Sequence, residues 1–192
     1  MRRIESKEQA EKRSRRNQII VGGILIFVML FSTLGYGFIS QGEQSTGDSK
    51  KIVYNGYEFV NQNDIWILSL GQYNFGFKFN PKEVDQVNSS VNFLNSYVGK
   101  PLYISSESSE AEVEIYRNLD QVVLRRQYAC LEGGDCTNPE YPIKTCADNF
   151  IIIQENEESN ITQVENCIFV KGKKENLTAI TDEFLFKMLN VR

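Results

Sequence analysis

Four cysteines are the residues of this chain whose type and spacing carry the most chemical information. Cys130, Cys136, Cys146 and Cys167 are separated by five, nine and twenty residues, so no CxxC motif is present. A redox-active dithiol and a structural zinc site both usually need such closely spaced cysteines. If this part of the chain is exported, the even number of cysteines instead predicts two disulfide bonds.

Four cysteines can pair in three ways. A hairpin centred on Asn156 and Glu157 would set Cys146 opposite Cys167 and leave Cys130 to close a small loop with Cys136. The same register would also set two like charges, Asp148 and Glu165, opposite each other. The hairpin therefore favours one pairing without excluding the other two.

Histidine-dependent chemistry is excluded because the chain contains no histidine. Ser-His-Asp and Cys-His nucleophile pairs and histidine-ligated zinc all need an imidazole. No Ser-x-x-Lys motif, nucleophile elbow, P-loop or GxGxxG motif is present either. The sequence thus favours a protein that is not an enzyme, although it does not decide the question.

Carboxylates are the remaining candidates for catalysis or metal binding. One group lies at the start of a predicted helix and another in a polar turn, and both are expected to be solvated surface: Glu107, Glu110, Glu112 and Glu114, and Glu155, Glu157 and Glu158. A loop at 132–140 offers Glu132, Asp135, Asn138 and Glu140 as oxygen ligands, but it lacks the alternation of a calcium loop. We therefore assign no catalytic, cofactor-binding or metal-ligating residue and no cofactor.

Charge and hydropathy divide the chain into parts. Residues 1–18 hold seven basic and three acidic side chains, whereas residues 19–192 hold 14 basic and 22 acidic ones. No charged residue occurs between Arg16 and Glu43, and the apolar residues 19–39 would span about 31 Å as a helix, close to the thickness of a bilayer. A cleaved signal peptide, with Ser40 and Gly42 at its cleavage site, is the alternative, but its apolar region is usually shorter.

We therefore predict four segments. Residues 1–18 form a basic cytoplasmic arm, 19–39 a transmembrane helix in contact with membrane lipid, 40–51 a flexible stalk and 52–192 a disulfide-stapled extracytoplasmic domain. The protein would be a single-pass protein of the cell membrane, with its N-terminus in the cytoplasm. An acidic domain of this kind is not expected to bind nucleic acid.

The start of the domain has the pattern of a β-meander. Asn55-Gly56, between apolar residues, predicts a type I′ hairpin turn. Strands are expected at 65–70 and 73–79, and the second carries an aromatic row at every other position that should face the core, namely Tyr73, Phe75, Phe77 and Phe79.

Helices and further strands follow along the chain. Asn80-Pro81 predicts a helix over 80–98, with Val84, Val87, Val91, Leu94 and Val98 on one face. A strand at 101–105 precedes a helix that Ser109 and Glu112 would cap and whose buried face would carry Ala111, Ile115 and Leu119. We favour a strand over helix continuation at 121–130, and expect strands in 149–154 and 161–170 and a closing amphipathic helix over 177–189. The fold class is α+β, with a mixed sheet covered by about three helices.

Three N-x-Ser/Thr sequons begin at Asn88, Asn160 and Asn176. They are candidate N-glycosylation sites only if the domain is exported, because the modification occurs on exported surfaces.

The basic arm, the single anchor, the FNPKEV segment, the paired-cysteine loop and the final TDEFLFKML segment together resemble small, uncharacterised, N-terminally anchored surface proteins of archaea. The resemblance covers the general layout of most of the chain and implies no activity. Our leading hypothesis is an anchored extracytoplasmic domain with a binding or structural role, a module that binds another protein or an envelope component. The alternatives are a carboxylate-dependent, glycan-processing envelope enzyme and an anchored subunit of a larger membrane complex.

Overall fold

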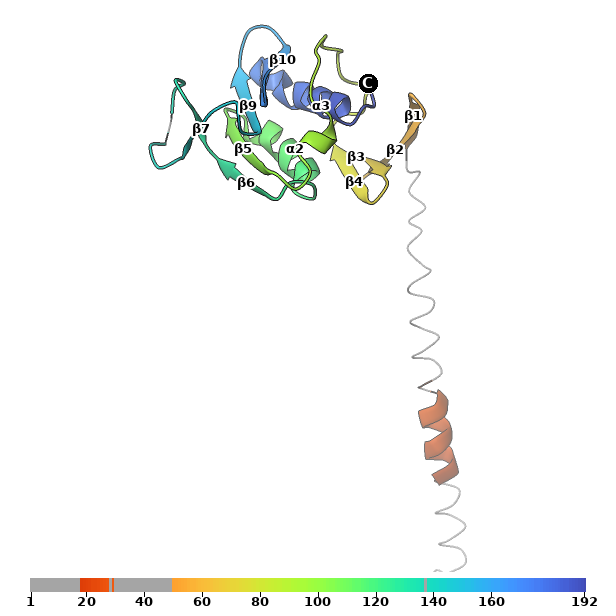
Figure 1. Cartoon of the computed structure of the whole chain (residues 1–192). Helices are drawn as coiled ribbons and strands as arrows, with labels where there is room; N and C mark the ends of the chain where they lie inside the picture. Colours follow the sequence, from red (N-terminus) through yellow and green to blue (C-terminus); the bar gives the residue numbers. More distant parts are fainter. Residues whose placement is uncertain (1–17, 28, 30–49, 137) are drawn as a thin grey trace, which may run out of the picture. The chain divides into compact units, whose positions relative to one another are not determined.

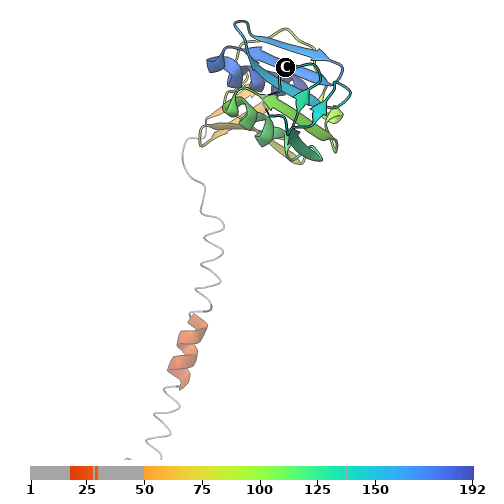
Figure 2. The same ribbon diagram turned by 90° about the vertical axis from the view of Figure 1, so that its left-hand side faces the viewer.

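The computed structural model describes residues 18–27, 29, 50–136 and 138–192 (Figures 1 and 2). The chain divides into two units, residues 1–48 and 49–192, which are described separately. In the first unit, residues 18–27 are helical, and apolar side chains such as Ile19 and Leu25 are exposed. Among the described residues, no helix combines the length and the apolar character needed to cross a bilayer. Residues 1–17 of the predicted arm, 28 and 30–39 of the predicted membrane helix and 40–49 of the predicted stalk lie outside the described residues.

The second unit begins with the expected antiparallel meander, sheet A. Its strands lie side by side in chain order: β1 (Lys51–Tyr54), β2 (Tyr57–Gln62), β3 (Ile65–Leu70) and β4 (Tyr73–Phe77). Asn55 and Gly56 both have positive φ, 48° and 84°, as the predicted turn requires. Phe75 and Phe77 are fully buried, so the prediction that the aromatic row of β4 faces the core is confirmed for these two residues.

A five-stranded mixed sheet, sheet B, forms the other half of the domain. Its order is β10 (Asn160–Val164), β11 (Cys167–Gly172), β9 (Phe150–Glu155), β5 (Pro101–Ser106) and β6 (Arg125–Tyr128). Only β10 is antiparallel to its neighbour; the other pairs are parallel. Helix α2 (Ser109–Leu119) connects β5 to β6, which confirms the predicted strand-helix-strand unit. Two short parallel strands, β7 (Cys130–Leu131) and β8 (Ile143–Lys144), complete the β-structure of the described residues.

Helices α2 and α3 (Leu177–Met188) lie between the two sheets (Figure 1). On one side, Phe186 of α3 contacts Phe59 and Phe77 of sheet A, with ring centroids 5.8 Å and 4.6 Å apart. On the other side, Ile180 packs on Gly172 of β11, where any side chain would collide with it. The predicted closing helix is thus present, but the expectation that it is amphipathic is wrong: because α3 contacts both sheets, it is buried nearly all around. Both sheets share one core.

The two faces of sheet B are covered by different parts of the chain. Alternate residues such as Ile104, Ile151 and Val170 face the helices and belong to the main core. The residues between them, such as Phe150 and Ile152, form a second apolar cluster with Ala129, Leu131, Cys146 and Cys167. The segment from β7 to β9, which carries three of the four cysteines, thus covers the face that has no helix.

The disulfide bonds join Cys130 to Cys136 and Cys146 to Cys167, the pairing that the sequence favoured. The hairpin from which that pairing was argued is wrong. Strand β11 lies between β9 and β10, and Cys167 is opposite Phe150 in a parallel register. The continuous apolar run of β9 explains the difference, because such a run is typical of a central parallel strand with both faces buried.

The helix predicted over 80–98 is not formed. Asn80 and Glu83 make the reciprocal bonds of a helix cap: the Asn80 N–H donates to Glu83 Oε2 and the Lys82 N–H donates to Asn80 Oδ1, both at 2.9 Å. The chain then runs without regular structure to a single 3-10 turn, η1 (Leu94–Ser96).

Tertiary hydrogen bonds explain why this segment leaves the helical path. The Val87 N–H donates to Glu183 Oε1 at 3.3 Å, and the Asn92 N–H donates to Gln163 Oε1 at 2.7 Å. Backbone donors that a helix would use internally are therefore bound to other elements. The apolar residues of the predicted stripe still pack on the core, apart from the exposed Val98. A smaller correction concerns α2, whose cap is Ser108 rather than Ser109, while its predicted buried residues are confirmed.

The free edge of β4 is bound by side chains instead of by another strand. Asn118 of α2 accepts from the Gly76 N–H and donates to the Gly76 carbonyl oxygen, each at 2.8 Å. Gln121 donates to the Asn74 carbonyl oxygen at 2.8 Å, and Glu114 accepts from the Lys78 N–H at 3.3 Å. Asn118 thereby satisfies both backbone groups of a buried strand residue.

We predict that Asn118→Leu destabilises the domain by about 2–4 kcal/mol, because it leaves the buried N–H and carbonyl of Gly76 unpaired. Urea unfolding followed by tryptophan fluorescence would measure the change. Gln121→Leu is the matched control, since Gln121 is exposed and bonds an exposed strand position; it should cost less than about 1 kcal/mol. Equal effects of the two substitutions would contradict the edge-pairing argument.

The two disulfides should contribute unequally to stability. They close loops with sequence separations of 6 and 21 residues, for which the chain-entropy model gives about 2 and about 3 kcal/mol. Replacing both Cys146 and Cys167 by Ala should therefore lower the urea midpoint more than replacing both Cys130 and Cys136. The opposite order would show that loop closure does not govern the effect.

Candidate functional site

Two carboxylates of the domain face each other in the core, Glu114 of α2 and Asp182 of α3. Their exposed fractions are 2% and 0%. Glu114 is paired with Arg117, whose Nη1 lies 2.7 Å from each carboxylate oxygen. Burial, and then the charge of Glu114, raise the pKa of Asp182 well above its usual range, so a proton on Asp182 that is shared with Glu114 fits this arrangement.

This pair has a structural role. Asp182 Oδ2 accepts from the Phe79 N–H at 2.9 Å, and Glu114 accepts from the neighbouring Lys78 N–H. Both groups are sealed from solvent, so no substrate can reach them without separating the helices from sheet A. A facing acid pair is what an envelope hydrolase would need, but such a pair must border a cleft.

A third buried carboxylate, Glu183, bonds to Arg192 at the end of the described chain. Arg192 bonds to Glu183 and to the Pro81 carbonyl oxygen, and its Nε donates to the Tyr54 hydroxyl at 3.0 Å. This guanidinium therefore ties α3 to β1 and to the segment after β4. Burial raises the pKa of Glu183, although Arg192 opposes that shift.

The accessible candidate site is a cavity of about 410 Å³ at the carboxyl ends of β5 and β9. We call it the tyrosine pocket. In sheet B, β5 has β6 on one side and β9 on the other, and the chain leaves β5 towards β6. The pocket lies at the carboxyl ends of β5 and β9, next to this point. Open parallel sheets commonly bind ligands at such a position. Its polar and aromatic lining includes Ser106, Glu107, Glu112, Tyr128, Asp135, Tyr141 and Gln154.

Aromatic rings and Glu112 form one wall of the tyrosine pocket. The Tyr128 ring stacks on Tyr141 with centroids 5.4 Å apart and planes 12° apart. The Glu112 carboxylate accepts from the hydroxyls of Tyr128 and Tyr116. The bond to Glu112 raises the pKa of Tyr128, and burial followed by the same carboxylate raises that of Tyr116. Both hydroxyls therefore stay neutral donors, and the stacked rings are held in place.

The charge of the tyrosine pocket is negative. Glu107, Glu112 and Asp135 line it, and none of the described lining residues is Lys or Arg. Glu107 accepts from the Glu155 N–H at 2.6 Å, so its orientation is fixed. Carboxylates beside aromatic faces favour a cationic group such as an ammonium or guanidinium, by charge and by cation–π attraction.

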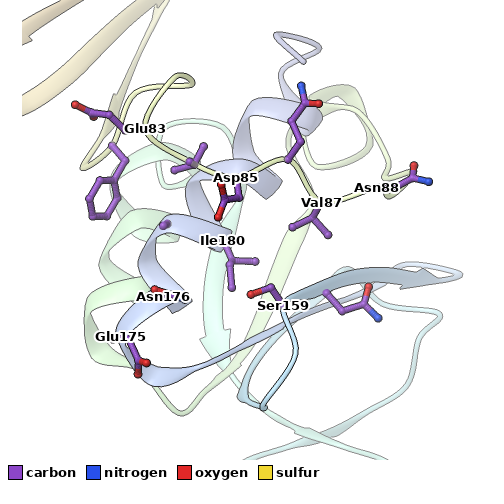
Figure 3. A pocket seen from close by; sticks show the side chains of 13 residues that line it. Glu83, Asp85, Val87, Asn88, Ser159, Glu175, Asn176 and Ile180 are labelled. Carbon is purple, nitrogen blue, oxygen red and sulfur yellow. The ribbon is translucent and has the colours of Figure 1, made fainter.

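A larger cavity of about 540 Å³ lies on the helix-covered side of sheet B (Figure 3). We call it the sequon pocket, because Asn88, Asn160 and Asn176 all line it. Ile180 of α3 forms part of its apolar lining, and acidic side chains such as Asp85 and Glu175 contribute to its rim. In Figure 3 the Asn88 side chain points away from the cavity.

The acidic groups noted in the sequence have different surroundings. The expectation that they are all solvated surface is wrong for Glu114, which is buried, and for Glu112, which is bonded to two tyrosines. The spacing of Glu114 from Ala111 and Asn118 placed it on the inward face of α2 and could have revealed its burial. Nothing in the sequence pointed to the pairing of Tyr128 with Tyr141.

The structure describes every residue of the oxygen-rich loop at 132–140 except 137. Among the described residues, no group of three or more His, Cys, Asp or Glu side chains lies close enough together to bind a metal ion. Asn138 instead uses its side-chain oxygen to accept from the Glu140 N–H at 3.0 Å.

Comparisons of the chain with models of protein families, with curated proteins and with solved structures found no match. The resemblance to anchored archaeal surface proteins therefore stays a prediction.

We predict that Asp182→Asn makes the domain more stable at high pH. A carboxyl group whose folded pKa is raised contributes stability that is fully present below its unfolded pKa and is lost as pH rises through the folded pKa. Asn keeps the acceptor for the Phe79 N–H and offers Glu114 a permanent donor. The advantage of the variant in urea midpoint should therefore grow from pH 4 to pH 9.

Asp120→Asn is the matched control, because Asp120 is exposed at the end of α2. Asp120 pairs with Arg126 at the surface, so this substitution should change stability by less than about 1 kcal/mol. Glu183 adds to the loss of stability with rising pH in both proteins, so the difference between variant and wild type isolates Asp182. A constant difference across this pH range would rule out a protonated Asp182.

Proposed function

We propose that the protein is a single-pass membrane protein whose extracytoplasmic domain binds a cationic group of another protein or of an envelope component in the tyrosine pocket. The observation that carries the proposal is the combination of three carboxylates with a stacked tyrosine pair in one accessible cavity. The site lies at the ligand-binding edge of a parallel sheet and is supported by the disulfide-containing segment.

Three observations support the membrane anchor and its direction. The apolar stretch 19–39 is long enough to span a bilayer, and a basic arm precedes it. In the helix over residues 18–27, apolar side chains have large exposed fractions, for example 74% for Ile19 and 62% for Leu25. Both disulfides lie in the second unit, which fits an oxidising compartment outside the cytoplasm.

The glycan-processing enzyme is less well supported than the binding module. Its strongest candidate pair, Glu114 and Asp182, is sealed in the core. In the tyrosine pocket, Glu112 is already bound by two hydroxyls, and Glu107 by a backbone N–H, so neither acid is held ready for proton transfer.

Protease treatment of intact cells tests the proposed topology. Trypsin should remove the domain by cutting near Lys50 and Lys51 while an N-terminal tag stays in the membrane and protected. Complete protection of the domain in intact cells, with cleavage after lysis, would place it inside and overturn the proposal.

Binding to the tyrosine pocket can be tested with the full chain in lipid nanodiscs and short lysine-rich peptides. Calorimetry should detect a lysine-rich peptide and lose the signal when the lysine side chains are acetylated. The double variant Glu107→Gln/Asp135→Asn should weaken binding by about tenfold, equivalent to about 1.4 kcal/mol.

The matched control is Glu157→Gln/Glu158→Gln, which removes two exposed acids of the turn after β9 that do not line the tyrosine pocket. It should change affinity by less than about twofold, because exposed charges outside a site act only through a screened field. Equal losses in both double variants would indicate nonspecific attraction to an acidic domain and contradict the site.

A further inference from the structure

We infer that Asn88, Asn160 and Asn176 carry N-linked glycans and form one glycan-bearing face around the sequon pocket. The inference rests on the proposed function, because it requires an exported domain, and goes beyond it by assigning a modification and a role to a second face. The supporting observation is that the fold brings together three sequons that are distant in the sequence.

The three asparagines come from different elements. Asn88 lies in the irregular segment after β4, Asn160 begins β10, and Asn176 ends η2 (Lys174–Asn176), just before α3. All three line the same cavity. Sequons scattered over the surface would not be expected to line one cavity. Here the segment 80–93 and the β9–β10 turn bring the three asparagines to the same cavity.

Each sequon is presented as a glycosyltransferase requires. The three asparagines are exposed, and so are the acceptor hydroxyl residues Ser90 and Thr162, while Thr178 is partly exposed. The middle residues are Ser89, Ile161 and Leu177, none of which is proline.

The side-chain amides of these asparagines are also uncommitted. None of them makes a side-chain hydrogen bond within the described part of the chain, and Asn176 does not cap α3. Asn80 and Asn118, by contrast, are buried and hold backbone groups through their side chains. Attaching a glycan to any of the three asparagines would therefore break no side-chain hydrogen bond of the folded domain.

The modification is a group transfer from a lipid-linked glycan phosphate or pyrophosphate, catalysed by a membrane oligosaccharyltransferase. The asparagine amide nitrogen forms a bond to the anomeric carbon of the first sugar and loses one proton. The bond between that carbon and the phosphate oxygen of the donor breaks, and the lipid phosphate leaves with the electron pair. No oxidant or reductant is required.

The surface around the sequon pocket suits a hydrated glycan and not an apolar partner. Its rim carries acidic and amide side chains, including Glu83, Asp85 and Glu175. None of the large exposed apolar residues found in the second unit lines the pocket. Glycans here would keep proteins away from the helix-covered side of sheet B.

The tyrosine pocket would stay open. The two cavities share no lining residue. The tyrosine pocket lies at the carboxyl ends of β5 and β9, whereas the sequon pocket is lined by the segment after β4, the β9–β10 turn and the start of α3. Glycans on the three asparagines would therefore leave the tyrosine pocket free for a ligand.

The test uses the full chain, tagged and purified from cells of its own organism. Mass spectrometry of the intact protein and of its glycopeptides should find glycans at all three asparagines. Ser90→Ala, Thr162→Ala and Thr178→Ala should each remove one glycan while keeping the asparagine, and Asn→Gln at the same sequons should give the same losses. Asn95→Gln, at an exposed asparagine outside any sequon, should leave the mass of the glycans unchanged.

Two outcomes separate this inference from the proposed function. Unmodified asparagines on a domain that protease removes from intact cells would overturn the inference and leave the proposed function standing. A domain that is protected in intact cells would overturn both. The triple hydroxyl variant should also bind the lysine-rich peptide within twofold of wild type, and a tenfold change would refute the separation of the two pockets.

Discussion

The pairing of the free edge of β4 with side chains is the interaction on which the rest of the domain depends. A strand edge buried inside a protein must find partners for its N–H and carbonyl groups, and a further strand is the usual solution. Here Asn118 of α2 and Gln121, just after α2, bond to β4 itself. Glu114 of α2 and Asp182 of α3 bond to Lys78 and Phe79, the two residues that follow the strand. Because each side chain must match one backbone group of β4 or of these two residues, the bonds fix the position and rotation of both helices against sheet A.

This arrangement explains why charged groups lie in the core. Glu114 and Asp182 accept hydrogen bonds from consecutive backbone N–H groups, but two ionised carboxylates at such a site would repel each other. Arg117 pairs with Glu114, and a proton on Asp182, whose pKa is raised by burial and by the charge of Glu114, removes the repulsion. A second pair, Glu183 and Arg192, joins α3 to the segment after β4. Polar contacts as well as the apolar core therefore hold α3 against its neighbours on both of its sides.

The sequence predicted the elements that depend on local patterns and missed those that depend on tertiary partners. The Asn55-Gly56 turn, the buried part of the aromatic strand, the buried face of α2 and the presence of the closing helix follow from period and turn chemistry, and they are confirmed. The segment after Asn80 carries helix signals, yet Glu183 and Gln163 bind its backbone and keep it open. In the same way, β11 inserts between β9 and β10, which a local hairpin argument cannot foresee. The tyrosine pocket was missed because its residues come from several separate stretches between residues 104 and 169.

The different parts of the chain that cover the two faces of sheet B suggest why the tyrosine pocket lies beside the disulfide-containing segment. The face packed on α2 and α3 is occupied by the core, so little of it can change without cost to stability. The opposite face is covered by an irregular segment that β7, β8 and two disulfides hold in place. Loops on a rigid frame can present side chains such as Tyr141 and Asp135 without contributing to the main core. Cross-linking this segment to the sheet through Cys146 and Cys167 fixes the wall of the tyrosine pocket before any ligand binds, which lowers the entropy cost of binding.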